Sequence, residues 1–139
     1  MIAPVNFYIL HTTNWQAKDR LACQLVEKAW QQGNRIYIHT GSLVAAQHID
    51  ILLWTYKEES FLPHSISSTD PICIGYTEEV ADNMDVLINL SEVVPACISK
   101  FKRIVEIVDD IEPAREAGRR RYNFYKQQEH ELKVLQINR

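Results

Sequence analysis

The feature that most constrains this fold is an alternation of short apolar strands with amphipathic helices in the first half of the chain. Residues Val5–Leu10 form an apolar run with two aromatic side chains, which is typical of a buried strand. A second β-branched and aromatic run follows at residues 35–39. Between and after these runs, apolar residues recur at the spacing of one helix face: Ala22, Leu25, Val26, Ala29 and Trp30, then Ala45, Ile49, Leu52 and Leu53. Strands joined through helices are parallel, so the pattern predicts βαβ units.

The ends of these helices carry their own signals. Thr13 or Asn14 is expected to cap the first helix, and Gly33 follows its end. The turn Gly41-Ser42 is expected to cap the second helix, which ends near Trp54.

The second half of the chain continues the sheet after an irregular, proline- and serine-containing stretch at residues 57–71. Within that stretch residues 60–64 are expected to be extended. Further strands are expected at residues 72–75, 85–90 and 102–108, with a helical turn at 95–101. The fold predicted is a single α/β domain over residues 1–139, a mostly parallel open sheet with helices on both faces, and it leaves the strand order open. Residues 133–139 are expected to fray at the end of the domain.

Composition narrows the class of partner. The chain has 139 residues and a formal net charge of -3, which argues against general nucleic-acid binding. Its three cysteines, Cys23, Cys73 and Cys97, form no CxxC pair, so we expect free thiols in a reducing compartment. The first residues lack a signal-peptide pattern, and the expected location is the cytoplasm.

One segment stands out against this acidic background. Residues 112–126 read EPAREAGRRRYNFYK and predict a helix, because acidic residues and Pro113 suit its first turn. Arg115, Arg119, Tyr122 and Lys126 share one face by their spacing. The core face is expected to hold Ala114, Ala117, Phe124, Tyr125 and Leu132. The basic face is either a plain solvated surface or a site for an anionic group.

A second candidate surface is aromatic. Trp54, Tyr56, Phe61 and Leu62 cluster in and beside the irregular stretch. Large aromatic residues are enriched at the centres of interfaces, so this cluster is either a partner-binding patch or a seal over the end of the second helix.

Catalytic and cofactor motifs are missing from the sequence. The turns after the first two strands contain no GxGxxG or Walker loop, the five histidines have no metal-binding spacing, and no GxSxG motif occurs. We therefore expect no cofactor, no metal and no catalytic residues. Two rival hypotheses remain: a small nucleotide-binding enzyme that uses His11 and the Thr40-Gly41-Ser42 turn, and a direct nucleic-acid binder that uses the arginine helix and Tyr122.

Four pieces of the sequence together resemble the chi subunit family of bacterial DNA polymerase III. They are an opening strand Phe7-Tyr8-Ile9-Leu10, a Leu53-Trp54 pair followed by Ser60-Phe61-Leu62-Pro63-His64, a buried strand Val86-Leu87-Ile88-Asn89-Leu90, and the closing Arg121-Tyr122-x-x-Tyr125. The resemblance spans nearly the whole chain. Its specific parts are the Ser-Phe-x-Pro-His piece and the closing helix.

The resemblance implies a non-catalytic linker in DNA replication. Family members pair with a small subunit, psi, which tethers them to the clamp loader, and they bind the acidic C-terminal tail of single-stranded DNA-binding protein, which ends in a phenylalanine carboxylate. By position, Arg115, Arg119 and Tyr122 match the tail-binding residues. Asn123 stands where a further cation is expected, and Lys126 on the same face compensates for it. Trp54 and Phe61 match the positions that contact psi, or a helicase that competes with psi for the same surface.

Overall fold

The computed structural model describes residues 2–14, 16–56, 62–66, 70–77, 79–80 and 84–137. It is built on one seven-stranded sheet in the order β3-β4-β2-β5-β6-β1-β7. Every strand pair of this sheet is parallel. The open, mostly parallel α/β fold predicted from the sequence is therefore confirmed.

Most of the helices and strands lie close to the predicted ranges, with the exceptions of β3 and β7. The strands are β1 (Val5–Leu10), β2 (Ile36–His39), β3 (His64–Ile66), β4 (Ile72–Gly75), β5 (Val86–Asn89), β6 (Arg103–Val108) and β7 (Leu132–Ile137). The helices are α1 (Ala17–Gln31), α2 (Leu43–Thr55), the short 3-10 helix η1 (Ala96–Lys100) and α3 (Glu112–Gln127).

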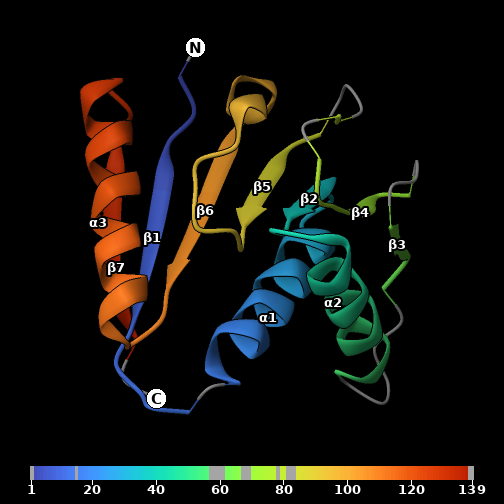
Figure 1. Cartoon of the computed structure of the whole chain (residues 1–139). Coiled ribbons are helices and arrows are strands. Elements are labelled where there is room, and N and C mark those ends of the chain that lie inside the picture. The colour runs from blue at the N-terminus through green and yellow to red at the C-terminus, as the bar shows by residue number, and fades with distance from the viewer. Residues whose placement is uncertain are drawn as a thin grey trace.

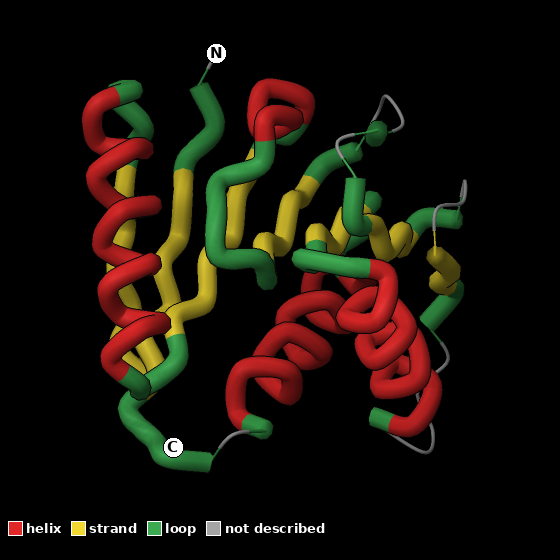
Figure 2. Tube along the Cα trace, viewed as in Figure 1, coloured by secondary structure: helices red, strands yellow, loops and turns green. Residues whose placement is uncertain are grey.

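Two apolar layers lie on opposite faces of the sheet, one under α1 and α2 and the other under α3. Figures 1 and 2 show how these helices run along the strands. Side chains alternate along each strand, so Ile36 and Ile38 of β2 pack in the layer under α1 and α2. Tyr37, between them, packs in the layer that contains Tyr125 of α3. Helices on both faces explain why the strands are apolar throughout instead of alternating with polar residues.

The chain diverges at the carboxyl ends of β1 and β6, which are neighbours in the sheet. β1 leads into α1 on one face, whereas β6 leads into α3 on the other (Figure 1). Such a divergence leaves the side chains near the strand ends uncovered by the connecting segments. The candidate site described below lies beside this point.

The expectation that residues 133–139 fray is wrong for most of that segment. Leu132–Ile137 forms the edge strand β7, paired in parallel with β1 from Val5↔Leu132 to Leu10↔Ile137. The pairing satisfies backbone groups of β1 that would otherwise form a bare sheet edge. Leu132 consequently belongs to a strand and not to the core face of α3.

Smaller differences concern segment ends. The N-cap of α1 is Gln16, with no side-chain cap, although Asn14 Oδ1 accepts a hydrogen bond from Gln16 N at 3.0 Å. In α2, Ala46 is the buried alanine in place of Ala45, which is half-buried. The extended piece expected at 60–64 lies later, at β3, and residues 57–61 fall outside the described part of the chain.

Candidate functional site

The basic helix α3 lies close against the sheet because of one glycine. A Cβ built on Gly118 would meet Val108 Cγ2 of β6 at 2.8 Å, which is closer than real Cβ contacts. Glycine thus lets the helix backbone approach β6. Pro113 stands in the first turn of α3, where its missing N–H costs no hydrogen bond.

A hollow of about 150 Å³ opens between α3 and the strands beneath it. Its apolar lining comes from three strands, β1, β6 and β7: Phe7, Ile9, Val108 and Val134. Its helix side is formed by Arg115, Gly118, Arg119 and Tyr122. We call this the α3 hollow. It combines an apolar floor with two guanidinium groups, a combination that suits a ligand with both an apolar and an anionic part.

Aromatic contacts hold the floor in place. The Phe7 ring meets Tyr122 edge to face at a centroid distance of 5.4 Å and Tyr125 at 5.9 Å. Edge-to-face pairs of this kind contribute about 0.5–1.5 kcal/mol beyond simple burial. Tyr122 is therefore a positioned wall of the hollow.

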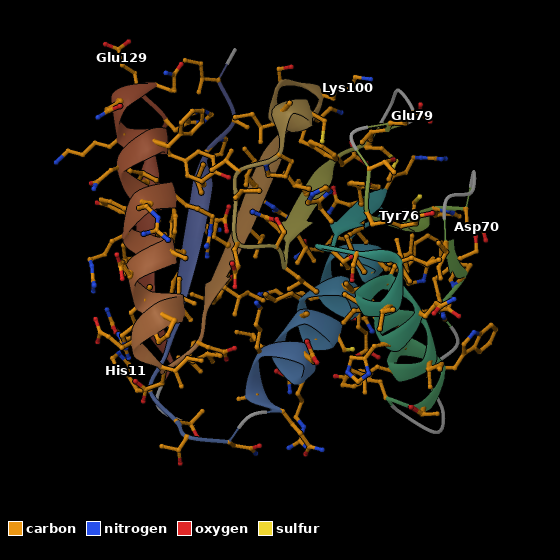
Figure 3. All side chains as sticks on the ribbon, viewed as in Figure 1. His11, Asp70, Tyr76, Glu79, Lys100 and Glu129 are labelled. Carbon is orange, nitrogen blue, oxygen red and sulfur yellow. The ribbon has the colours of Figure 1, made fainter. Side chains whose placement is uncertain are left out.

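Arg115 is held by several acceptors. Its Nη2 donates to Asp110 Oδ1 at 2.7 Å and to Leu10 O at 3.0 Å, and it lies 3.3 Å from His11 Nδ1. His11 in turn contacts the side-chain amide of Gln136. Figure 3 shows His11 beside the N-terminal end of α3, at the opposite end of the helix from Glu129. The Arg115 side chain is only 26% exposed, so its charge stays at a fixed place on the rim.

Arg119 is held more loosely. Its Nη2 donates to Glu112 Oε1 at 3.1 Å, and the two side chains are 61% and 78% exposed. Exposed ion pairs of this kind contribute about 0–1 kcal/mol. An incoming carboxylate can therefore replace Glu112 at little cost.

Arg121 departs from the expected surface run. It is buried, and its Nε donates to Glu106 Oε1 at 2.8 Å, inside the layer under α3. Glu106 also accepts from Tyr125 Oη at 2.7 Å and Asn89 Nδ2 at 3.0 Å. Burial raises the pKa of Glu106, while Arg121 opposes that rise. The sequence signal for this network is Glu106, a lone acidic residue between the apolar residues Val105 and Ile107 of β6.

The predicted site residues separate into two groups. Arg115, Arg119 and Tyr122 meet at the α3 hollow, whereas Asn123 and Lys126 are exposed on α3 and do not line it. Phe124, expected in the core, is 40% exposed. The sequence did not predict Val134 as a site residue, because it did not predict the strand β7. Phe7 and Ile9 belong to a strand predicted to be buried, and nothing in the sequence indicates that they lie beside α3.

The second candidate surface lies on α2. Its large apolar residues Leu43, Val44, Ile51 and Trp54 are all exposed, Trp54 by 55%. The Trp54 ring lies 4.7 Å from His64 of β3, centroid to centroid. Tyr56 is half-buried and Leu62 is buried, so Leu62 does not belong to a surface patch, and Phe61 falls outside the described residues. The helix is thus apolar on both its sheet-facing and its open side, which predicts a covering partner.

The Thr40-Gly41-Ser42 turn acts as a helix cap. Ser42 Oγ accepts from Ala45 N at 3.2 Å, and the Thr40 hydroxyl donates to Gly75 O at 3.0 Å. These contacts use the hydroxyl groups within the fold, which weakens the nucleotide-site hypothesis. Among the described residues no group of three or more His, Cys, Asp and Glu side chains is arranged to hold a metal ion. Within the same residues, no helix has the length and apolar character needed to cross a membrane.

Comparison with known proteins gives a consistent family. The sequence model described as "DNA polymerase III chi subunit, HolC" matches residues 2–133. A Pseudomonas aeruginosa protein named DNA polymerase III subunit chi is 33% identical over 138 residues, 97% of each chain. Proteins of the same name from Haemophilus influenzae and Escherichia coli are 28% identical (88% of this chain, 89% of theirs) and 25% identical (79% of each chain).

A solved structure, that of T4 UvsW, shares the fold. It superposes with a TM-score of 0.71 and 8% sequence identity over 98% of this chain. The chain spans 42% of that protein's length. At this identity the similarity describes the fold alone.

Proposed function

This chain belongs to the family of DNA polymerase III chi subunits, and from that premise we propose that it links single-stranded DNA-binding protein to the clamp loader during replication. In this role it contributes binding surfaces and no catalytic residue to the holoenzyme. Its place of action is then the cytoplasm. Two surfaces serve the two ends of the link: the α3 hollow for the acidic C-terminal tail of single-stranded DNA-binding protein, and the open face of α2 for psi.

The single observation that carries the first assignment is an apolar hollow rimmed by two arginines. A terminal phenylalanine presents a ring and a carboxylate within one residue, and the α3 hollow offers an apolar floor beside Arg115 and Arg119. Tyr122 adds a ring edge to the wall. Preceding aspartates of the tail meet Lys126, which is exposed on α3. The hollow thus supplies a complementary group for each part of the tail.

Arg115 and Arg119, the two arginines at the rim of the α3 hollow, contribute differently to tail binding. Arg115 is already tied to Asp110 and Leu10 O, so it acts as a fixed positive charge. Arg119 can leave Glu112 and turn to the ligand, because that pair is exposed. A charge-assisted hydrogen bond from Arg119 to the tail carboxylate is worth about 1.5–3 kcal/mol when well formed. Since the tail reaches an open surface, we expect micromolar affinity that falls with added salt.

Fluorescence anisotropy with a labelled tail peptide tests this assignment. Arg119→Ala is expected to weaken binding by about tenfold or more, which corresponds to the lower end of that energy range. The matched control is Arg120→Ala, which removes an arginine paired to Glu116 on the same helix but outside the hollow. Equal affinity for the wild type and Arg119→Ala, or equal losses in both variants, would reject the hollow as the tail site.

The open face of α2 is the proposed site for psi. Its exposed apolar residues run from Leu43 in the first turn to Trp54 in the last, and a large half-exposed indole is a frequent centre of an interface. Phe61 is included by its place in the motif. The same surface would then also serve a helicase that competes with psi.

Calorimetric titration with psi tests the second surface. Trp54→Ala is expected to lower psi affinity by tenfold or more and to leave tail binding unchanged. Val93→Ala is the control, because Val93 is 65% exposed and lies away from α2, in the segment before η1. Unaltered psi binding by Trp54→Ala would remove α2 from the interface.

A further inference from the structure

A second cationic depression lies on the sheet face that α1 covers, opposite the α3 hollow. It has a volume of about 150 Å³ and is bounded by α1 and the adjoining strands β1, β6 and β5. Its polar side chains are Asn6 and Tyr8 of β1, Lys28 and Gln32 of α1, and Arg103 of β6. We call it the α1 groove. Nothing in the proposed function uses it.

The cations of the α1 groove differ from those of α3. Each arginine of α3 has a carboxylate partner, whereas the side chains of Lys28 and Arg103 make no hydrogen bond or ion pair with the described residues. Lys133 extends the row, because it pairs in register with Asn6 across β1 and β7, and its side chain also lacks such a partner there. Register partners share a face of the sheet, so Lys133 lies on the side of the groove. Three positive charges with no partner among the described residues therefore lie along one face.

Capping of α1 does not account for these charges. The carbonyl groups at the end of α1 accept from cap backbone N–H groups and from Asn34 Nδ2. Neither Lys28 nor Arg103 donates to these carbonyl groups. Their positive potential is consequently available to an external anion.

The remaining groups of the groove indicate the kind of anion. Tyr8 provides an aromatic ring, and Asn6 and Gln32 provide amide groups that both donate and accept hydrogen bonds. A row of cations combined with an aromatic ring is how proteins hold single strands of nucleic acid, with phosphates on the cations and a base on the ring. An acidic peptide would use the cations and leave the ring without a role.

We propose that the α1 groove binds a short stretch of single-stranded nucleic acid, with Lys28, Arg103 and Lys133 contacting phosphates and Tyr8 stacking on a base. The inference is independent of tail and psi binding. The contact is weak, because the whole chain carries a net charge of -3. Three phosphate contacts predict a slope of about −2 for log affinity against log salt on a single strand. In this proposal the nucleic acid contacts the α1 face of the sheet, and not the paired arginines of α3 on the opposite face.

Anisotropy of a labelled 15-nucleotide oligothymidylate, titrated with the full chain from 20 to 200 mM salt, tests the proposal. Lys28→Ala/Arg103→Ala is expected to lower the affinity at least tenfold at the lowest salt and to reduce the slope to about −0.7. Tyr8→Leu is expected to lower the affinity about fivefold or more with the slope unchanged, because stacking carries no charge. Arg120→Ala, an exposed and paired arginine on the other face, is the matched control and should retain full binding.

The outcomes separate this proposal from the proposed function. Arg119→Ala should lose the tail peptide and keep the oligonucleotide, and saturating tail peptide should not displace the oligonucleotide. Absence of saturable binding at 20 mM salt, or equal losses in Arg120→Ala and the groove variant, would overturn the proposal. Tighter binding of an oligoglutamate peptide than of oligothymidylate through the same residues would overturn it too and would assign the groove to acidic peptides.

Discussion

Replacing the buried Arg121 by methionine is expected to be the most damaging single change in α3. Its guanidinium, 6% exposed, donates to Glu106 at 2.8 Å and to Glu92 O at 3.1 Å. Methionine fills a similar volume but leaves Glu106 as a buried carboxylate without a cation. Breaking one side of a buried ion pair costs about 3–5 kcal/mol.

The cost is measurable by urea unfolding followed by circular dichroism, and it corresponds to a fall in Tm of roughly 10–20 °C for a chain of this size. Burial already raises the pKa of Glu106, and removing Arg121 raises it further. The folded variant then binds a proton more readily than the unfolded chain, so the stability of Arg121→Met should fall as pH rises. Its deficit relative to the wild type should shrink when the pH is lowered from 7 to 5.

Two companion variants make the argument specific. Arg120→Met breaks an exposed pair, with side chains 69% and 62% exposed, and should cost no more than about 0.5 kcal/mol. Glu106→Gln/Arg121→Met removes the buried charge while keeping an acceptor for Tyr125, so it should be more stable than Arg121→Met alone by about 1 kcal/mol or more. A loss below about 1 kcal/mol in Arg121→Met, or no recovery in the double variant, would refute the account of a buried charge pair.

Three further predictions concern the rest of the fold. The pKa of Asp85 is lowered, chiefly because its carboxylate accepts a hydrogen bond from Arg35 N at 2.7 Å. Asp85→Asn should therefore destabilise the protein at pH 7, and the difference in unfolding free energy from the wild type should vanish as the pH falls below about 4. Urea unfolding that shows the same difference at pH 7 and below pH 4 would argue against this. Burial raises the pKa of Cys23 to about 12, so its thiol should alkylate roughly a thousandfold more slowly at pH 8 in the native protein than after unfolding, as mass spectrometry of labelled peptides would report. A Cβ on Gly75 would meet the Tyr37 hydroxyl at 2.0 Å, so Gly75→Ala should cost about 1–3 kcal/mol, and a melting temperature equal to the wild type would contradict that clash.

The sequence was a good guide wherever apolar periodicity determines structure. The strands β1, β2, β4, β5 and β6 and the three long helices fall within a few residues of the predicted ranges, because both layers of the sheet need apolar side chains at fixed intervals. The strand β7 was missed because its stability comes from pairing with β1, a contact more than a hundred residues away in the chain. Local sequence carries no trace of such a partner.

The candidate site was only partly predictable for a related reason. Helical spacing correctly grouped Arg115, Arg119 and Tyr122, since residues three and four apart share a face. Spacing also places Arg121 on the core face, four residues from both Ala117 and Tyr125, but it could not show that Glu106 lies there to pair with the guanidinium. It also could not supply Val134, whose place in the hollow depends on the strand that follows the helix.

The most direct test of the central claim is a double-mutant cycle on the tail carboxylate. Peptides ending in a free or an amidated phenylalanine are titrated against the wild type and Arg119→Ala by anisotropy. We predict that amidation weakens binding to the wild type by about tenfold or more and has little further effect on Arg119→Ala, because both changes remove the same contact. Independent, additive losses would contradict the account and would show that Arg119 does not hold the terminal carboxylate at the α3 hollow.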